Sequence, residues 1–156
     1  MIKPDSPGDL ARLRQETGVP LCVSERLFTR YAYREVLERN AADVVMADLV
    51  WTGGITEGQK IAILADTFHL PFTPHDCTGL ITLFANLHLC AAVPNAMILE
   101  TVRGFYKGWY ADVYTENISI RDGYAEFPIR PGLGTSIREE FMKRPDVTIR
   151  RSTIRQ

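Results

Sequence analysis

The stretch that decides the fold runs from Ala42 to Gly79 and reads ADVVMADLVWTGGITEGQKIAILADTFHLPFTPHDCTG. It contains two short apolar runs, DVVMAD and LPFTPH, which are typical of buried strands. Residues 56–68 lie between them and carry apolar side chains at helical spacing, on Ile61, Leu64, Ala65 and Phe68. A strand, a crossover helix and a second strand in this order predict a parallel βαβ unit, because parallel neighbours need a connection of this length.

Asp48 and His75 are the last residues of the two predicted strands. Parallel strands end at the same edge of a sheet, which is the edge where α/β barrels and open sheets carry their chemistry. An aspartate beside a histidine fixes the orientation of the imidazole, so this pair is a candidate for proton transfer. Two simpler interpretations stay open. Asp48 could only cap the turn at Gly53–Gly54, and His75 could be an ordinary loop histidine.

The rest of the chain continues the alternation of helices and short strands. The predicted helices cover residues 10–16, 29–39 and 80–92, and the further predicted strands cover residues 19–23 and 96–100. Gly18 is expected to end the first helix. The apolar face of the second helix is expected to consist of Phe28, Tyr31, Val36 and Leu37.

Four titratable residues close or follow the four predicted strands, in the order Glu25, Asp48, His75 and Glu100. In a parallel sheet their side chains emerge at one edge, so the recurrence indicates a functional site there. Glu25 could instead form a surface ion pair with Arg26 or Arg30, and Glu100 could pair with Arg103.

The pattern changes after Glu100. Two alternating runs around Asp122 and Gly123 predict a β-hairpin over residues 118–127, and residues 136–142 are expected to form a last short helix. The chain is therefore predicted to consist of a barrel portion, residues 1–103, and a C-terminal loop, hairpin and tail packing on it, residues 104–156.

Composition excludes several classes of protein. The 156 residues are 46% apolar and carry 18 basic against 19 acidic side chains, for a net charge of −1. This balance does not indicate a nucleic-acid or membrane partner, and the basic residues within 138–156 are interpreted as a solvated surface. The three cysteines lack metal-ligand spacing and no signal peptide is recognised, so a reducing, cytoplasmic location is expected.

Together these motifs resemble the C-terminal part of the enolase superfamily. The matching stretches are Ser24-Glu25-Arg26, Asp48 with Gly53 to Glu57, Thr73-Pro74-His75, Pro94-Asn95 and Leu99-Glu100. Within the superfamily the chain is most similar to the mandelate racemase/muconate-lactonizing group, and closest to its galactonate- and mannonate-type sugar-acid dehydratases. The resemblance implies an α/β fold, the C-terminal half of a (β/α)₇β barrel with about four βα units.

The resemblance also implies a reaction, in which the proton α to a carboxylate is abstracted during the dehydration of an acid sugar. Members of this group hold Mg²⁺ with three carboxylates, and Glu25 resembles one of them. His75 resembles the acid/base with Asp48 as its partner, and Glu100 resembles the acidic group that serves the enediolate. Arg26, His75 and Glu100 are assigned to substrate binding.

Residues 1–4 carry no acid that could serve as the preceding metal carboxylate. We therefore expect a truncated or separately expressed part of an enzyme that is inactive as an isolated chain. The alternative is a non-catalytic half-barrel that self-assembles or complements a separate N-terminal part. Open strand edges favour a homo-oligomer in either case. Racemase, dehydratase and cycloisomerase chemistry stay open, as does the substrate.

Overall fold

A three-stranded parallel sheet forms the centre of the molecule. The computed structural model describes residue 3 and residues 6–153, so the opening loop expected before residue 10 lies partly outside the described residues. The strands pair in chain order, β1 (Cys22–Val23), β2 (Val44–Asp48) and β3 (Phe72–His75). Helix α2 (Thr29–Glu38) connects the first two strands. The alternation of strand and helix confirms the expected partial barrel.

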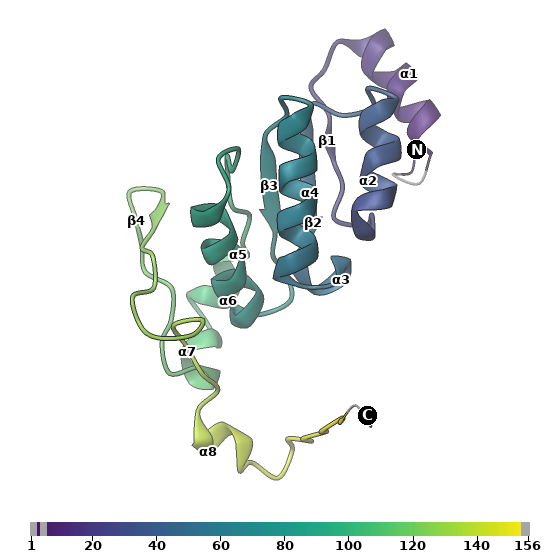
Figure 1. Ribbon diagram of the computed structural model, residues 1–156. Helices are drawn as coiled ribbons and strands as arrows, with labels where there is room; N and C mark the ends of the chain where they lie inside the picture. The colour runs from purple at the N-terminus through teal and green to yellow at the C-terminus, as the bar shows by residue number, and fades with distance from the viewer. Residues whose placement is uncertain (1–2, 4–5, 154–156) are drawn as a thin grey trace.

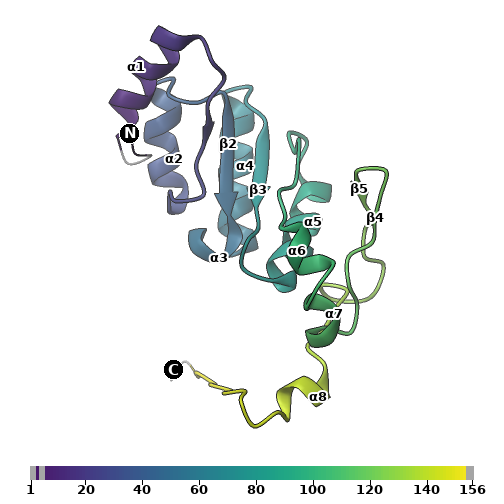
Figure 2. The same ribbon diagram turned by 180° about the vertical axis from the view of Figure 1, so that it is seen from behind.

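The helices cover one face of this sheet. Figure 1 shows α2, α4 (Ile55–Thr67) and α5 (Leu80–Ala92) along that face, and Figure 2 shows the strands in front of the helices from behind. Val45 and Ala47 of β2 point into the apolar core and are fully buried. Val44 and Met46, which alternate with them, are only partly covered, so the opposite face of the sheet is the more open one.

The central βαβ unit forms as predicted, with one addition. Strands β2 and β3 are parallel and the predicted crossover helix is α4. A four-residue helix, α3 (Leu49–Thr52), precedes it and was not predicted. Ile61 and Ala65 are buried as expected. Phe68 follows the end of α4 and is 40% exposed, so its expected place on the buried face is wrong.

The expected apolar face of α2 is also partly wrong. Val36 and Leu37 are buried, but Tyr33 takes the place assigned to Tyr31, which is 61% exposed. Residues two apart point in different directions on a helix, so only one of these tyrosines can face the core. Phe28 precedes the first helical residue and is likewise exposed. The first helix, α1 (Pro7–Thr17), ends at Gly18 in a left-handed conformation, as predicted.

The predicted strand over residues 96–100 does not form. Its contact with β3 is reduced to an isolated parallel bridge between Phe72 and Ala96. The next bond of a parallel ladder would use the N–H of residue 74, and Pro74 has none. The segment bulges instead, so that the Glu100 N–H reaches the Pro74 carbonyl at 3.1 Å, and the Thr73 hydroxyl donates to the Ile98 carbonyl.

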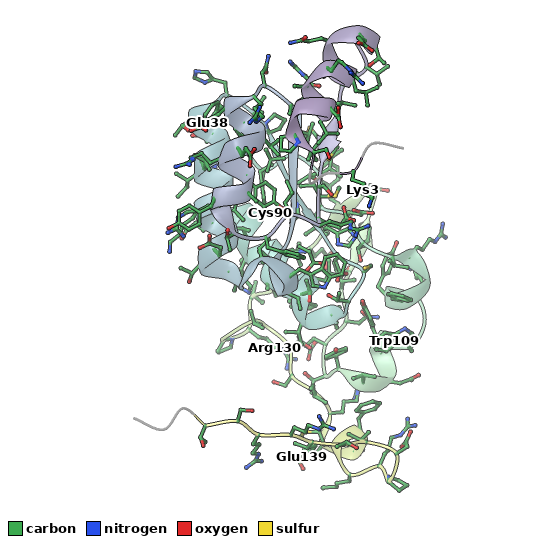
Figure 3. The ribbon with its side chains drawn as sticks, turned by 90° about the vertical axis from the view of Figure 1, so that its right-hand side faces the viewer. Lys3, Glu38, Cys90, Trp109, Arg130 and Glu139 are labelled. Atoms are coloured by element: carbon green, nitrogen blue, oxygen red, sulfur yellow. The ribbon has the colours of Figure 1, made fainter. Side chains whose placement is uncertain are left out.

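The C-terminal part packs on α5 through a second apolar cluster that includes Leu83 and Tyr110. The predicted hairpin is present as two paired antiparallel strands. Figure 3 shows the segment that carries Glu139 extending away from the rest of the molecule. The elements here are α6 (Arg103–Tyr106), α7 (Tyr110–Val113), β4 (Ile120–Arg121), β5 (Tyr124–Ala125) and α8 (Glu139–Met142).

Two general features complete the fold. The three cysteines, Cys22, Cys77 and Cys90, are free thiols. Within residues 6–153, every helix is too short or too polar to span a lipid bilayer.

Tyr33 ties the turn after β1 to β2. Its hydroxyl lies 2.8 Å from the Met46 carbonyl, 2.9 Å from that of Ser24 and 3.2 Å from that of Leu27. The hydroxyl donates its single proton among these three carbonyl groups. Burial, and then the nearby carboxylates, raise the pKa of Tyr33, so the phenol keeps this proton. Glu25 lies in the tethered turn, and its backbone position therefore depends on Tyr33.

Replacing Tyr33 with phenylalanine keeps the buried ring but leaves these carbonyl groups without their donor. We expect the free energy of unfolding to fall by about 1–3 kcal/mol, because unsatisfied buried polar groups are costly. Urea denaturation followed by circular dichroism measures this. Tyr31→Phe on the exposed side of the same helix is the control and should change stability by less than about 0.5 kcal/mol. Equal effects of the two substitutions would contradict the tether.

Candidate active site

Strands β2 and β3 bring Asp48 and His75 together at their carboxyl ends. The two residues are directly paired in the register of the parallel ladder. His75 Nδ1 lies 2.8 Å from Asp48 Oδ2. The Asp48 side chain is fully buried and the His75 side chain is 12% exposed. The residues that the sequence places at two strand ends are thus in direct contact.

Asp48 also caps α3, so its two oxygens have different partners. Oδ1 accepts from the Val50 N–H at 2.8 Å and from the Trp51 N–H at 3.4 Å, while Oδ2 is left for His75. The cap therefore does not exclude the pair with histidine. The chain then turns through Gly53, whose φ of 111° is a conformation that favours glycine.

The Asp48 carboxylate determines which nitrogen of His75 is free. An ionised carboxylate only accepts hydrogen bonds, so Nδ1 carries the proton and Nε2 keeps its lone pair. The His75 carbonyl accepts from Asn86 Nδ2 of α5 at 2.9 Å, and the Trp51 ring packs against the imidazole with 5.5 Å between centroids. Asn86 thus holds the backbone of His75 while Trp51 contacts its ring. Nε2 is the atom that can take a proton from a bound molecule.

The other candidate residues lie at the same edge without direct contact with this pair. Glu25 is half-buried in the turn after β1, where the Ser24 hydroxyl donates to its Oε2 at 3.2 Å. Glu100 and Arg26 are exposed. In the part of the chain that the structure describes, neither Glu25 nor Glu100 forms a salt bridge, and Arg30 pairs with a glutamate of α4 at 2.7 Å.

The carboxylates at this edge act on common neighbours. The pKa of the Cys77 thiol is raised, first by burial and then by the negative charges of Asp48, Asp76, Glu100 and Glu25. Burial also raises the pKa of Cys22, with smaller contributions from Glu100 and Glu25. The strand ends thus concentrate negative charge in one region, and cations or protonated groups are favoured there.

The described residues do not by themselves fit a magnesium site. Glu25 offers the hard oxygen donor that Mg²⁺ prefers. However, residues 3 and 6–153 contain no group of three or more His, Cys, Asp or Glu side chains placed to hold one metal ion. Glu25 is therefore a single donor rather than part of a complete ligand set.

One buried acid at this edge was not predicted from the sequence. Asp76 follows His75 and is fully buried in the turn before α5. The signal was present, because an Asp followed closely by Thr and Gly is typical of a turn in which the carboxylate accepts from the next backbone N–H groups. Trp51 contacts His75 while remaining 40% exposed.

Comparison with known proteins agrees with this architecture. The chain matches the family described as Enolase C-terminal domain-like over residues 1–141. It belongs to this family. The resemblance on which the sequence analysis rested is thereby confirmed, and the partial barrel of this enolase C-terminal domain-like chain is the fold that the match implies.

Curated relatives of this domain are sugar-acid dehydratases. The D-xylonate dehydratase of Haloferax volcanii is 34% identical over 136 residues, which are 87% of this chain and 33% of that protein. The arabinonate dehydratase of Saccharolobus solfataricus is 38% identical over 130 residues, 83% of this chain and 34% of that protein. The chain therefore spans about a third of the length of the curated relatives it matches.

Solved structures place the domain in the mandelate racemase subgroup. An enolase of that subgroup from Agrobacterium tumefaciens superposes with a TM-score of 0.84 and 40% identity, covering 91% of this chain and 38% of that one. An enolase protein from the Sargasso Sea environmental genome superposes with a TM-score of 0.90 and 40% identity, covering 99% of this chain and 41% of that one. Sequence and structure thus lead to the same group.

Replacing Asp48 with asparagine tests whether Asp48 sets the tautomer of His75. The asparagine oxygen can still cap α3, but its amide group now donates toward Nδ1, so the ring proton should move to Nε2. We expect the ring-nitrogen chemical shifts of His75 in alkaline buffer to exchange their pattern, as measured by NMR. Asp66→Asn on the exposed side of α4 is the control and should leave these signals unchanged. An unaltered His75 pattern in Asp48→Asn would count against the pair.

Proposed function

We propose that the chain is the C-terminal catalytic part of an enolase-superfamily enzyme of the mandelate racemase/muconate-lactonizing type, acting in the dehydration of acid sugars. The observation that carries the proposal is the His75 Nδ1 to Asp48 Oδ2 contact of 2.8 Å at the ends of paired strands. The names of the relatives, D-xylonate dehydratase and arabinonate dehydratase, support sugar acids as the substrate class.

In this proposal the Nε2 lone pair of His75 takes the proton α to the substrate carboxylate. The imidazole becomes an imidazolium, which the buried carboxylate of Asp48 stabilises. The imidazolium then transfers this proton to the departing β-hydroxyl, which leaves as water. The resulting enol tautomerises to a 2-keto-3-deoxy acid. Glu100, in its protonated form, donates a hydrogen bond to the enediolate formed on proton abstraction, and Arg26 contributes to binding the substrate. These two assignments rest on the family resemblance.

Magnesium enters the proposal through the family, with Glu25 as the one carboxylate of this chain assigned to it. Because the described residues do not fit a complete site, no step of the mechanism is assigned to the metal. The proton transfer described above depends only on His75 and Asp48.

Calorimetric titration with Mg²⁺ tests the donor set. We expect no binding in the micromolar range, because a lone half-buried carboxylate holds Mg²⁺ weakly against its own hydration shell. Glu25→Gln should give the same result as the unmodified chain. Micromolar binding that Glu25→Gln abolishes would show that further ligands are recruited, and would overturn the single-donor assignment.

A chimera tests the catalytic assignment. Residues 1–141 replace the matching third of the arabinonate dehydratase of S. solfataricus, and formation of the 2-keto-3-deoxy acid from arabinonate is measured. We expect activity, and we expect His75→Asn to lower kcat by about 10²–10⁴-fold, the contribution of a positioned acid/base. His69→Asn, on an exposed turn after α4, is the control and should retain kcat. A folded, active chimera that is indifferent to His75→Asn would overturn the proposal.

A second candidate function is a non-catalytic half-barrel that assembles with itself or with a separate N-terminal part. It is favoured by the exposure of Met97 and Ile98, 53% and 62%, beside a groove formed with the β4–β5 hairpin. In the described residues, β1 pairs only with β2, so one sheet edge is open. Light scattering of the chain and the activity of the chimera together distinguish the two candidates. A stable homo-oligomer of the chain, combined with a chimera that has no dehydratase activity, supports this second candidate.

The proposed domain division follows the two apolar clusters. Residues 1–103 form the barrel portion, and residues 104–156 form the loop, hairpin and tail that pack on it. Helix α5 contributes one side to each cluster, so it is the surface through which the C-terminal part is attached.

A further inference from the structure

Asp76 is a buried acid that the proposed mechanism leaves without a role. Its side chain is fully buried. Oδ1 accepts from the Thr78 N–H at 3.2 Å and from the Gly79 N–H at 3.3 Å, and Oδ2 accepts from the Thr101 hydroxyl at 3.2 Å. Burial raises the pKa of Asp76, and the three hydrogen bonds partly oppose this. A carboxyl group is costly to bury unless its oxygens are hydrogen-bonded.

The turn that leads into α5 explains two of these three bonds. Oδ1 accepts from the N–H groups of Thr78 and Gly79, which precede the first residue of α5, in a local turn of the kind that aspartate side chains stabilise. Oδ2 is directed to Thr101, which is 25 residues further along the chain and lies outside α5. The local turn does not need this contact, so the bond to Thr101 requires another explanation.

The positions of the two bonded residues suggest that explanation. Asp76 directly follows His75, and Thr101 directly follows Glu100. Between β3 and the segment that carries Glu100, the backbone ladder is interrupted at Pro74. The Asp76–Thr101 bond therefore joins the ends of two segments at the point where the sheet provides few backbone bonds of its own.

Aromatic residues of the C-terminal part lie near Asp76. Burial, and then the charge of Asp76, raise the pKa of both Tyr110 and Tyr114. The Tyr114 hydroxyl also lies close to Gly79, because a Cβ atom added to this glycine would be 3.4 Å from the hydroxyl oxygen. Exclusion of water strengthens a hydrogen bond to a carboxylate. The Asp76–Thr101 hydrogen bond, called the tie below, is therefore suited to holding a fixed distance.

We propose that Asp76 is a positioning residue that sets the spacing between His75 and Glu100 through its hydrogen bond to Thr101. The meaning of this spacing for catalysis rests on the proposed function, whereas the tie itself is a property of the chain. Asp76 contacts neither reacting atom in this role.

Thr101→Val and Thr101→Ser form the matched pair that tests the tie in the unmodified chain. Valine keeps the shape of threonine but removes the hydroxyl, and serine keeps the hydroxyl. We expect the Glu100 amide to exchange with solvent about tenfold faster in Thr101→Val, as expected for the loss of one hydrogen bond, with Thr78 and Gly79 unchanged. Thr101→Ser should match the wild type. Unchanged exchange at Glu100, or equal acceleration at all amides, would overturn the tie.

Asp76→Asn separates the bond from the charge. The asparagine oxygen still accepts from the Thr78 and Gly79 N–H groups, and its amide donates to the Thr101 hydroxyl, so the tie survives with reversed polarity. We expect exchange at Glu100 to stay near the wild-type rate. Acceleration as large as that in Thr101→Val would show that charge, rather than the bond, holds this region, and would overturn the proposal.

The chimera then tests the consequence for catalysis. We expect Thr101→Val to lower kcat about tenfold with KM within about twofold of the parent, because a displaced acid impairs the reaction more than binding. An unchanged kcat would overturn the positioning role. If His75→Asn is without effect in the same chimera, the proposed function fails instead, and hydrogen exchange at Glu100 alone decides the tie.

Discussion

The burial of Asp48 is the constraint on which the rest of this site depends. A carboxylate with no exposed surface is stable only when both of its oxygens are hydrogen-bonded. One oxygen receives the first N–H groups of α3, and the other receives His75. These contacts require β2 and β3 to be in register and require the imidazole proton to lie on Nδ1. Strand register, helix α3 and the free Nε2 are therefore three consequences of one buried charge.

The same principle recurs between β1 and β2 and between β3 and the segment that follows α5. The strands are only two to five residues long, so backbone ladders alone fix their ends weakly. Tyr33 joins the turn after β1 to β2, Asp48 joins β2 to β3, and Asp76 joins β3 to Thr101. Each tie is a buried side chain, and each one ends beside a candidate residue of the active site. The edge of the sheet is thus ordered by side chains where the backbone provides few bonds.

This division explains what the sequence could and could not predict. Periodicity was sufficient for α4, α5 and the hairpin, because their patterns are local. The strand over residues 96–100 failed because its ladder depends on the missing N–H of Pro74, more than 20 residues away in the sequence. Tyr31 was predicted to face the core in place of Tyr33, although Tyr33 lies three and four residues before Val36 and Leu37 and therefore shares their face of the helix. The Asp48–His75 contact followed from strand order, whereas the second bond of Asp76 depends on a distant partner, Thr101.

The two chemical requirements of the proposed reaction are distributed differently along the chain. Proton transfer is local, because His75, its carboxylate partner and the proposed tie to Thr101 all lie within residues 44–101. Coordination of a metal is not local, since Glu25 is a single donor among the described residues. A barrel of successive βα units permits this separation, because each strand end adds one side chain to a shared edge. The acid/base geometry is consequently set by this chain itself, whatever supplies the remaining charge.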